Sequence, residues 1–180
     1  NAYETLVKDE QREVFRLPGF INDMVKKGLL GNKSGQGFFK KEKGEDGSKY
    51  FYYDYKSGQY TPSVRPKFAS AETAKPIDDP GKRLQTVLSG TDKGALFAWK
   101  NLRDTLIYAF NRVPEIADDI VNIDNAMKWG FNWDLGPFEM LDAIGVKNFV
   151  KRAEQDGLKV PAGLASIERF YKYENNKDLY

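Results

Sequence analysis

An apolar stripe through residues 93–113 constrains the fold of this 180-residue chain more than any other feature. Its members recur at spacings of three and four, so they lie on one side of an α-helix. They are Ala95, Trp99, Leu102, Leu106, Ala109 and Val113. Pro114 then ends the helix, because proline cannot continue the backbone hydrogen-bond ladder. A helix with one continuous apolar side packs against neighbours, and the stripe therefore predicts a mainly α-helical core.

Shorter helices are predicted before and after this one. Asp118 or Asp119 is suited to cap the helix that follows it. A proline-rich linker, residues 62–92, can hold short helical pieces near residues 69–74 and 82–88. The other segments with a helical apolar pattern are residues 3–16, 18–27, 120–129, 137–144, 146–155 and 161–171.

One β-hairpin is predicted between the helical parts. Residues 49–55 are dense in tyrosine and phenylalanine, residues 56–58 form a turn, and residues 59–61 can run back. A polar spacer over residues 41–47 precedes them. The tyrosines lie next to several lysines, which could form a stacking platform for single-stranded nucleic acid. We prefer a hairpin that covers neighbouring helices.

Charge and composition exclude several classes of function. The 28 basic and 26 acidic side chains give a net charge of +2, without the cationic excess that binding to nucleic acid normally requires. No apolar run approaches the roughly 20 residues that cross a membrane. The chain contains no cysteine, which excludes disulfides, thiolate catalysis and cysteine-based metal sites. These features are typical of a cytoplasmic protein.

The absence of histidine bears directly on chemistry. Histidine is the commonest general base near neutral pH and the commonest metal ligand. Asp118, Asp119 and Asp124 match no calcium-loop spacing, and we interpret them as capping and surface charges. We therefore expect no catalytic group and no metal ligand in this chain.

Two glycine-containing segments carry a resemblance to one family. The first reads Gly31-Asn32-Lys33-Ser34-Gly35-Gln36-Gly37-Phe38-Phe39. The second reads Ile123-Asp124-Asn125-Ala126-Met127-Lys128-Trp129-Gly130, followed by Gly136-Pro137-Phe138-Glu139-Met140-Leu141-Asp142-Ala143-Ile144-Gly145. Both resemble signatures of the C-terminal domain of 3-hydroxyacyl-CoA dehydrogenases, although Phe39 stands where that family usually has tyrosine. Two such matches over roughly half of the chain are hard to attribute to chance.

The order of the two segments predicts a repeated organisation. In one helical repeat of the family the Gly-Pro-Phe-Glu segment precedes the Lys-(Ser/Thr)-Gly-x-Gly-Phe segment, whereas here it follows. We therefore expect residues 3–40 to finish a first helical repeat and residues 93–180 to form a second. Residues 41–92 would be the β-hairpin and linker between them. Asn1 and Ala2 resemble the remnant of a cleaved expression tag.

The resemblance implies a fold and a function. The fold would be the mainly α arrangement of helical repeats found in the C-terminal domain of 6-phosphogluconate dehydrogenase, with one β-hairpin insert. The intact enzyme would oxidise (S)-3-hydroxyacyl-CoA with NAD, as in bacterial multifunctional β-oxidation proteins that also carry an enoyl-CoA hydratase. In the family an upstream Rossmann domain binds NAD and supplies a His–Glu pair and a Ser, and an Asn comes from the first repeat. None of those positions falls in this chain.

The helical part would then form one wall of the acyl-CoA cleft and a homodimer or pseudo-dimer contact. Asn101 lies near the place of the family's Asn, but in the second repeat, and receives no role. A free-standing helical scaffold without catalysis is the alternative.

The motif residues themselves are expected to be structural. Lys33 could meet a CoA phosphate, but a tight turn packed under Phe38 is the preferred interpretation. The start of the helix at Gly136 could bind an anion, but a close fit against a neighbour is preferred. We interpret Trp99, Trp129 and Trp133 as core and loop anchors. The motif residues with this structural assignment are Lys33, Ser34, Gly35, Gly37, Phe38, Asp124, Gly136, Pro137, Phe138, Glu139 and Asp142.

The apolar side of the helix at residues 18–27 predicts self-association. Phe20, Ile21, Met24 and Val25 would face solvent unless the hairpin or the second repeat covers them. Contiguous apolar patches of this kind are uncommon on monomers. We therefore expect dimerisation through the N-terminal segment, or a segment that is loosely held.

Overall fold

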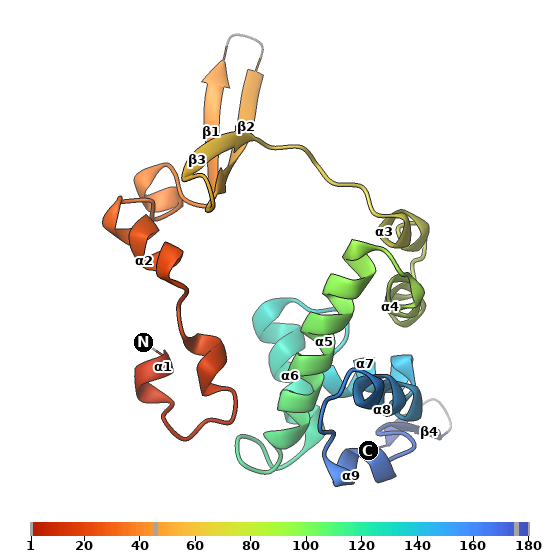
Figure 1. Ribbon diagram of the computed structural model, residues 1–180. Coiled ribbons are helices and arrows are strands. Elements are labelled where there is room, and N and C mark those ends of the chain that lie inside the picture. Colours follow the sequence, from red (N-terminus) through yellow and green to blue (C-terminus); the bar gives the residue numbers. More distant parts are fainter. Residues whose placement is uncertain (1, 45–46, 175–176, 180) are drawn as a thin grey trace. The chain divides into compact units, whose positions relative to one another are not determined.

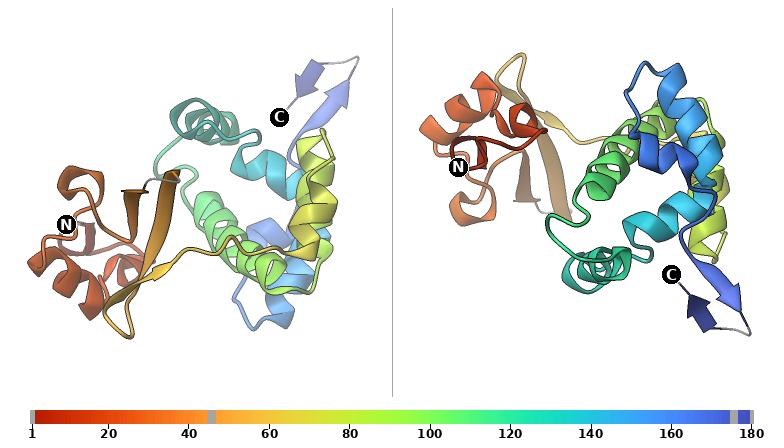
Figure 2. Two further views of the ribbon diagram at one scale, coloured as in Figure 1. Left: turned by 90° about the horizontal axis from the view of Figure 1, so that it is seen from above. Right: turned by 90° about the horizontal axis from the view of Figure 1, so that it is seen from below.

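The computed structural model describes residues 2–44, 47–174 and 177–179 (Figures 1 and 2). The chain divides into two compact units, Asn1–Pro66 and Lys67–Tyr180. Each unit has its own internal contacts and is described by itself.

The first unit combines short helices with a three-stranded antiparallel sheet. Its sheet has the order β1-β2-β3. Its elements are α1 (Ala2–Thr5), the 3-10 helix η1 (Arg12–Phe15), α2 (Gly19–Lys26), the 3-10 helix η2 (Asn32–Ser34), β1 (Phe39–Gly44), β2 (Gly47–Asp54) and β3 (Gln59–Pro62). The predicted hairpin is confirmed as β2 and β3. Strand β1 contradicts the polar spacer predicted over residues 41–47, because backbone pairing with β2 makes a strand there without any apolar pattern.

The hairpin covers part of α2. Phe20 stacks on Tyr55 with ring centroids 4.7 Å apart and meets the ring of Phe38 edge-on at 6.4 Å. Met24 is buried. Val25 remains 55% exposed, so the apolar side of α2 is covered at Phe20 and Met24 and open at Val25. Whether the chain dimerises there stays a prediction.

The second unit is almost entirely helical. Its elements are α3 (Ala69–Ala74), α4 (Pro80–Ser89), α5 (Lys93–Asn111), α6 (Ile120–Phe131), α7 (Pro137–Ile144), α8 (Val146–Gln155), α9 (Ala162–Ser166), β4 (Lys172–Glu174) and β5 (Lys177–Leu179). The helix predicted over residues 161–171 is wrong beyond Ser166. After Ser166 the chain leaves the helix: the backbone is extended at Ile167, bends at Glu168 and Phe170, and then reaches the buried Tyr171.

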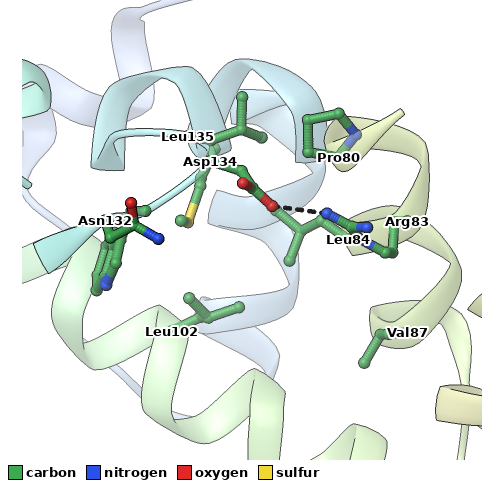
Figure 3. A pocket seen from close by; sticks show the side chains of 10 residues that line it. Pro80, Arg83, Leu84, Val87, Leu102, Asn132, Asp134 and Leu135 are labelled. Atoms are coloured by element: carbon green, nitrogen blue, oxygen red, sulfur yellow. Dashed lines mark hydrogen bonds and ion pairs between the residues drawn. The ribbon is translucent and has the colours of Figure 1, made fainter. Parts of the chain in front are cut away.

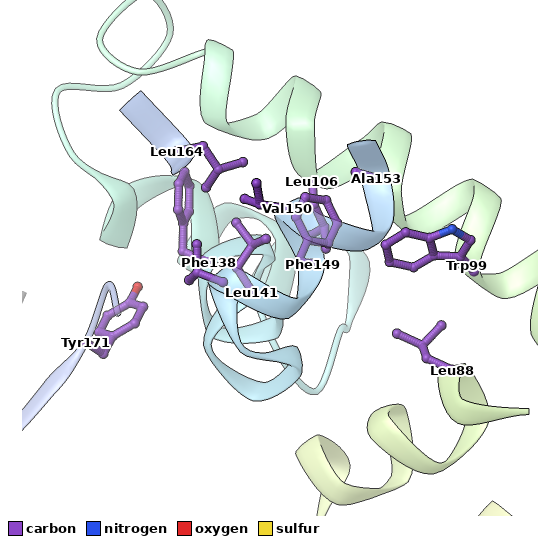
Figure 4. Packing of buried hydrophobic residues seen from close by; sticks show 11 residues of the cluster. Leu88, Trp99, Leu106, Phe138, Leu141, Phe149, Val150, Ala153, Leu164 and Tyr171 are labelled. Carbon is purple, nitrogen blue, oxygen red and sulfur yellow. The ribbon is translucent and has the colours of Figure 1, made fainter. Parts of the chain in front are cut away.

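The core of this unit forms around the predicted stripe of α5 (Figure 4). Trp99 and Leu106 of α5 are buried against Leu141 of α7 and Phe149 of α8. The rings of Trp99 and Phe149 meet edge-on at 5.5 Å. The prediction that Trp129 is a core or loop anchor is wrong. This side chain is 80% exposed, because α6 turns the position away from the core.

Aspartates cap three of these helices. Asp79, Asp92 and Asp119 each accept a hydrogen bond from a backbone N–H in the first turn of α4, α5 and α6. Asp92 also accepts hydrogen bonds from the backbone and hydroxyl of Ser70, which joins α3 to the start of α5. Of the two candidates for α6, the cap is Asp119.

Asp156 should make the stability of this unit sensitive to acid. Its carboxylate accepts a hydrogen bond from the Trp99 indole N–H at 2.7 Å and pairs with Arg103, and these contacts lower its pKa. A carboxyl group with a lowered pKa contributes stability above its unfolded-state pKa and loses it as the pH falls through the folded-state pKa. We expect the thermal midpoint to decrease as the pH is lowered from about 5 to about 2, and to decrease less in Asp156→Asn.

Thermal unfolding across this pH range, followed by tryptophan fluorescence, measures the difference. Asp118→Asn removes the same charge at an exposed position and serves as the control. An equal pH dependence in wild type and Asp156→Asn would contradict the prediction.

Candidate functional site

The second motif forms a buried junction between α6 and α7. Asp124 of α6 is 1% exposed. Its carboxylate accepts hydrogen bonds from the backbone N–H of Phe138 at 2.9 Å, the backbone N–H of Glu139 at 3.1 Å and the hydroxyl of Tyr171 at 2.7 Å. A carboxylate at a helix N-terminus is favoured by the helix dipole. Asp124 therefore caps α7 from a neighbouring helix.

Gly136 permits the close approach of these helices. A Cβ atom added at Gly136 would lie 2.3 Å from the Cβ and Cγ atoms of Asp124. The backbone N–H of Gly136 donates to the Glu139 carboxylate at 2.7 Å, and Lys128 pairs with the same carboxylate at 2.6 Å. The position therefore has no room for a side chain.

Asp142 holds the segment that follows α9 against α7. Its carboxylate accepts hydrogen bonds from the backbone N–H groups of Phe170 and Tyr171, both at 2.8 Å, and lies 3.6 Å from Arg169. The ring of Phe170 meets that of Phe138 edge-on at 4.9 Å. These bonds hold the non-helical chain at Phe170 and Tyr171 against α7.

Burial affects the acid–base chemistry of this junction. It raises the pKa of Asp124, although the hydrogen bonds from Phe138 and Tyr171 act in the opposite direction. Burial also raises the pKa of Tyr171, and its hydrogen bond to Asp124 adds to the shift. All three hydrogen bonds of Asp124 are internal and its side chain has almost no access to solvent, so the geometry gives it packing partners and no path to a substrate. The structural assignment of these motif residues stays a prediction, which substitutions at Gly136 and Asp124 test.

The first motif lies in the other unit and forms a tight turn. The Ser34 hydroxyl donates to the backbone oxygen of Gln36 at 2.9 Å and accepts from the backbone N–H of Leu30 at 2.9 Å. Gly35 has the left-handed φ of 74°. A Cβ atom at Gly37 would lie 2.6 Å from the Cα of Gly31. Lys33 is exposed, and Phe38 is 49% exposed with its ring edge toward Phe20.

An apolar pocket of about 510 Å³ lies between α4, α5 and the loop before α7 (Figure 3). Arg83 and Asp134 form an ion pair at 2.6 Å beside it, drawn as a dashed line. The apolar lining residues are Pro80, Leu84, Val87, Leu102, Trp133, Leu135 and Met140. Such a pocket suits an apolar group with a polar end. Sequence patterns did not locate it, because its half-buried side chains come from α4, α5, the loop before α7 and α7 itself.

Other kinds of site are not found in the described part of the chain. Within residues 2–44, 47–174 and 177–179, no three His, Cys, Asp or Glu side chains are placed to hold a metal ion. Over the same residues, no helix is both long enough and apolar enough to cross a membrane.

Comparison with known proteins shows which enzymes the chain is similar to. The chain is 39% identical over 185 residues to a Bacillus subtilis protein named "Probable 3-hydroxyacyl-CoA dehydrogenase", a match that covers 100% of this chain and 23% of the relative. The chain matches the C-terminal part of 3-hydroxyacyl-CoA dehydrogenases along its whole length. The chain therefore spans about a quarter of the length of this relative.

Two further relatives agree with this assignment. Both are named "Putative fatty acid oxidation complex trifunctional enzyme", from Rickettsia prowazekii and Rickettsia felis. Each is 25% identical; the matches cover 94% and 95% of this chain and 22% and 23% of the relatives. No family model and no solved structure matches the chain.

Proposed function

We propose that this chain is the C-terminal helical part of an NAD-dependent 3-hydroxyacyl-CoA dehydrogenase of fatty-acid β-oxidation, active in the cytoplasm. The intact enzyme would oxidise (S)-3-hydroxyacyl-CoA to 3-ketoacyl-CoA. The observation that carries the proposal is the 39% identity to the Bacillus subtilis protein along the whole chain. The presence of both motifs supports it.

The described residues do not fit NAD. A dinucleotide site leads from a strand through a glycine-rich turn into the N-terminus of a helix. Here the glycine-rich residues 31–37 follow helix α2 and lead into strand β1. We therefore assign NAD binding to a separate Rossmann domain of the intact enzyme, and derive no step through the cofactor in this chain.

The proposed layout has two helical repeats of the 6-phosphogluconate dehydrogenase type. Residues 3–40 would end the first repeat, residues 41–92 would form the hairpin and linker, and residues 93–180 would form the second repeat. The order of the two motifs supports this layout. The two motifs also lie in different compact units, which divide at Pro66.

Within the intact enzyme this chain would bind and enclose part of the acyl-CoA substrate, and it would not catalyse the reaction. The apolar pocket beside Leu102 and Met140 supports a role in the wall of the acyl-CoA cleft, where apolar side chains exclude water from a hydrocarbon chain. Three large side chains, Phe97, Trp129 and Phe131, are at least 70% exposed and support a dimer or pseudo-dimer contact.

The assignment of NAD binding and oxidation to another part of the intact enzyme can be tested. We expect the 180-residue chain alone neither to bind NAD in a calorimetric titration nor to oxidise 3-hydroxybutyryl-CoA, whereas the intact protein does both. The reason is that the chain has no histidine and no dinucleotide turn. Micromolar binding of NAD to the isolated chain would contradict the assignment of NAD to another domain. An intact protein without NAD-dependent oxidation would overturn the proposed function.

A further inference from the structure

One face of the β1–β2 ribbon gathers aromatic and basic side chains. Successive side chains of a strand point to opposite faces, so Phe39, Lys41 and Lys43 of β1 share a face. In the antiparallel register Phe39 pairs with Tyr52, and Lys41 pairs with Tyr50. We call these five residues the aromatic–lysine face.

The side chains of this face are open to solvent. Phe39 is 69% exposed, Tyr50 55% and Tyr52 41%, and both lysines are exposed. Tyr53 and Tyr60 lie on the opposite face and are half-buried: the Tyr60 hydroxyl donates to the backbone oxygen of Gly37 at 2.6 Å, and Tyr53 meets Lys27. The aromatic residues of the sheet are thus divided between one packed face and one open face.

The charged side chains of the sheet are also divided between its two faces. The carboxylate of Glu42 lies on the packed face, where it pairs with Lys40 at 2.6 Å. Asp54, at the end of β2, lies on the side of Tyr52 by strand alternation, but its carboxylate is engaged in the following turn, where it accepts hydrogen bonds from the Lys56 N–H and the Ser57 hydroxyl. Among the described residues of the sheet, no other carboxylate shares the side of Lys41. Lys41 itself lies over the ring of Tyr50 at 5.6 Å.

This combination suits a planar ring that carries phosphates. Bases stack on exposed aromatic side chains, and lysine binds phosphate as a point charge. Alternate residues on one strand are roughly 7 Å apart, so Lys41 and Lys43 lie one and two such steps along β1 from Phe39. The spacing between these alternate residues is comparable to the distance between a base and the phosphates of its own nucleotide.

We propose that the aromatic–lysine face binds the 3′-phosphorylated adenosine diphosphate end of coenzyme A, with the adenine on Phe39 and Tyr52 and the phosphates on Lys41 and Lys43. The choice of coenzyme A rests on the proposed function, whose substrate is an acyl-CoA. The net charge of +2 disfavours a nucleic-acid polymer. Coenzyme A carries a third phosphate that NAD lacks, and titration with dephospho-coenzyme A measures the contribution of that phosphate.

Calorimetric titration of the 180-residue chain with coenzyme A tests the proposal. Phe39→Thr keeps a strand-forming residue and removes the ring, and should raise the Kd about fivefold or more. Lys41→Gln combined with Lys43→Gln should weaken binding at least as much and reduce its dependence on salt. Dephospho-coenzyme A should bind more weakly than coenzyme A to the wild type. It should bind the double lysine variant about as well as coenzyme A does.

Lys49→Gln is the matched control. It removes the same charge from the same ribbon, but Lys49 pairs with Glu42 on the packed face, so its Kd should equal that of the wild type. Far-ultraviolet circular dichroism verifies that every variant is folded.

Three results would overturn the proposal. They are an unchanged Kd in the Phe39 and lysine variants, an equal loss in Lys49→Gln, and binding of oligo(dT) or phosphatidylglycerol vesicles through these residues without binding of coenzyme A. The failure of the proposed function is a separate result, because it would appear as an intact protein without NAD-dependent oxidation whether or not this face binds coenzyme A.

Discussion

Gly136→Val should destabilise the second unit by about 3 kcal/mol or more, because the position has no room for a side chain. An added Cβ would lie 2.3 Å from two atoms of Asp124, and the backbone of Asp124 is only 2.5 Å away at its Cα, so a rotamer change cannot relieve the clash. Separation of α6 from α7 would also break the hydrogen bonds from Phe138 and Glu139 to Asp124. Urea unfolding followed by tryptophan fluorescence measures the loss.

Gly130→Ala provides the comparison within the same region. Gly130 lies near the end of α6, and an added Cβ meets nothing within 4 Å. Alanine has the higher helix propensity, so this variant should be neutral or more stable by up to about 1 kcal/mol. If Gly136→Val unfolds at the same urea concentration as the wild type, the junction is looser than its geometry indicates, and the motif glycine has another role.

Asp124→Ala should cost about 3–5 kcal/mol, because it leaves three buried donors without an acceptor. These donors are the backbone N–H groups of Phe138 and Glu139 and the hydroxyl of Tyr171. Tyr171→Phe removes one donor together with its need for an acceptor, so it should cost only about 1 kcal/mol. The stability lost in the double variant should be smaller than the sum of the losses in the two single variants, because both substitutions break the same hydrogen bond.

Asp119→Ala is the control for the loss of a carboxylate cap. Asp119 caps α6 through the backbone N–H of Asn122 at a more exposed position, and its removal should cost about 1 kcal/mol. Equal losses in Asp119→Ala and Asp124→Ala, measured by urea unfolding, would mean that Asp124 acts as an ordinary cap. They would also reopen the question of a functional role for this carboxylate.

Features that depend on residues close together in the sequence could be predicted from it. The apolar spacing in residues 93–113 predicted α5, because helical periodicity is a property of the segment itself. The strand residues and turn around Ser57 predicted the β2–β3 hairpin for the same reason. Residues 146–155 were predicted as a helix and form α8 over the same range. The motif residues also indicated the enzymes whose C-terminal part the chain matches in the comparison with the Bacillus subtilis protein.

Features that depend on partners far away in the sequence could not be predicted. Strand β1 has no apolar alternation and forms because its backbone pairs with β2. The non-helical segment at Phe170 and Tyr171 replaces a predicted helix, because its backbone N–H groups bind the Asp142 carboxylate 28 and 29 residues away.

The sequence by itself determined the helical class of the second unit, the hairpin and the resemblance to 3-hydroxyacyl-CoA dehydrogenases, since each is expressed in residue types at short spacing. Only the tertiary structure decided that Asp124, interpreted from the sequence as a capping and surface charge, is buried and caps another helix. It also decided that Trp129 faces solvent and that the apolar pocket lies beside Leu102. The physical reason is the same in each case: burial and hydrogen-bond partners depend on which elements pack together, and local periodicity does not encode that choice.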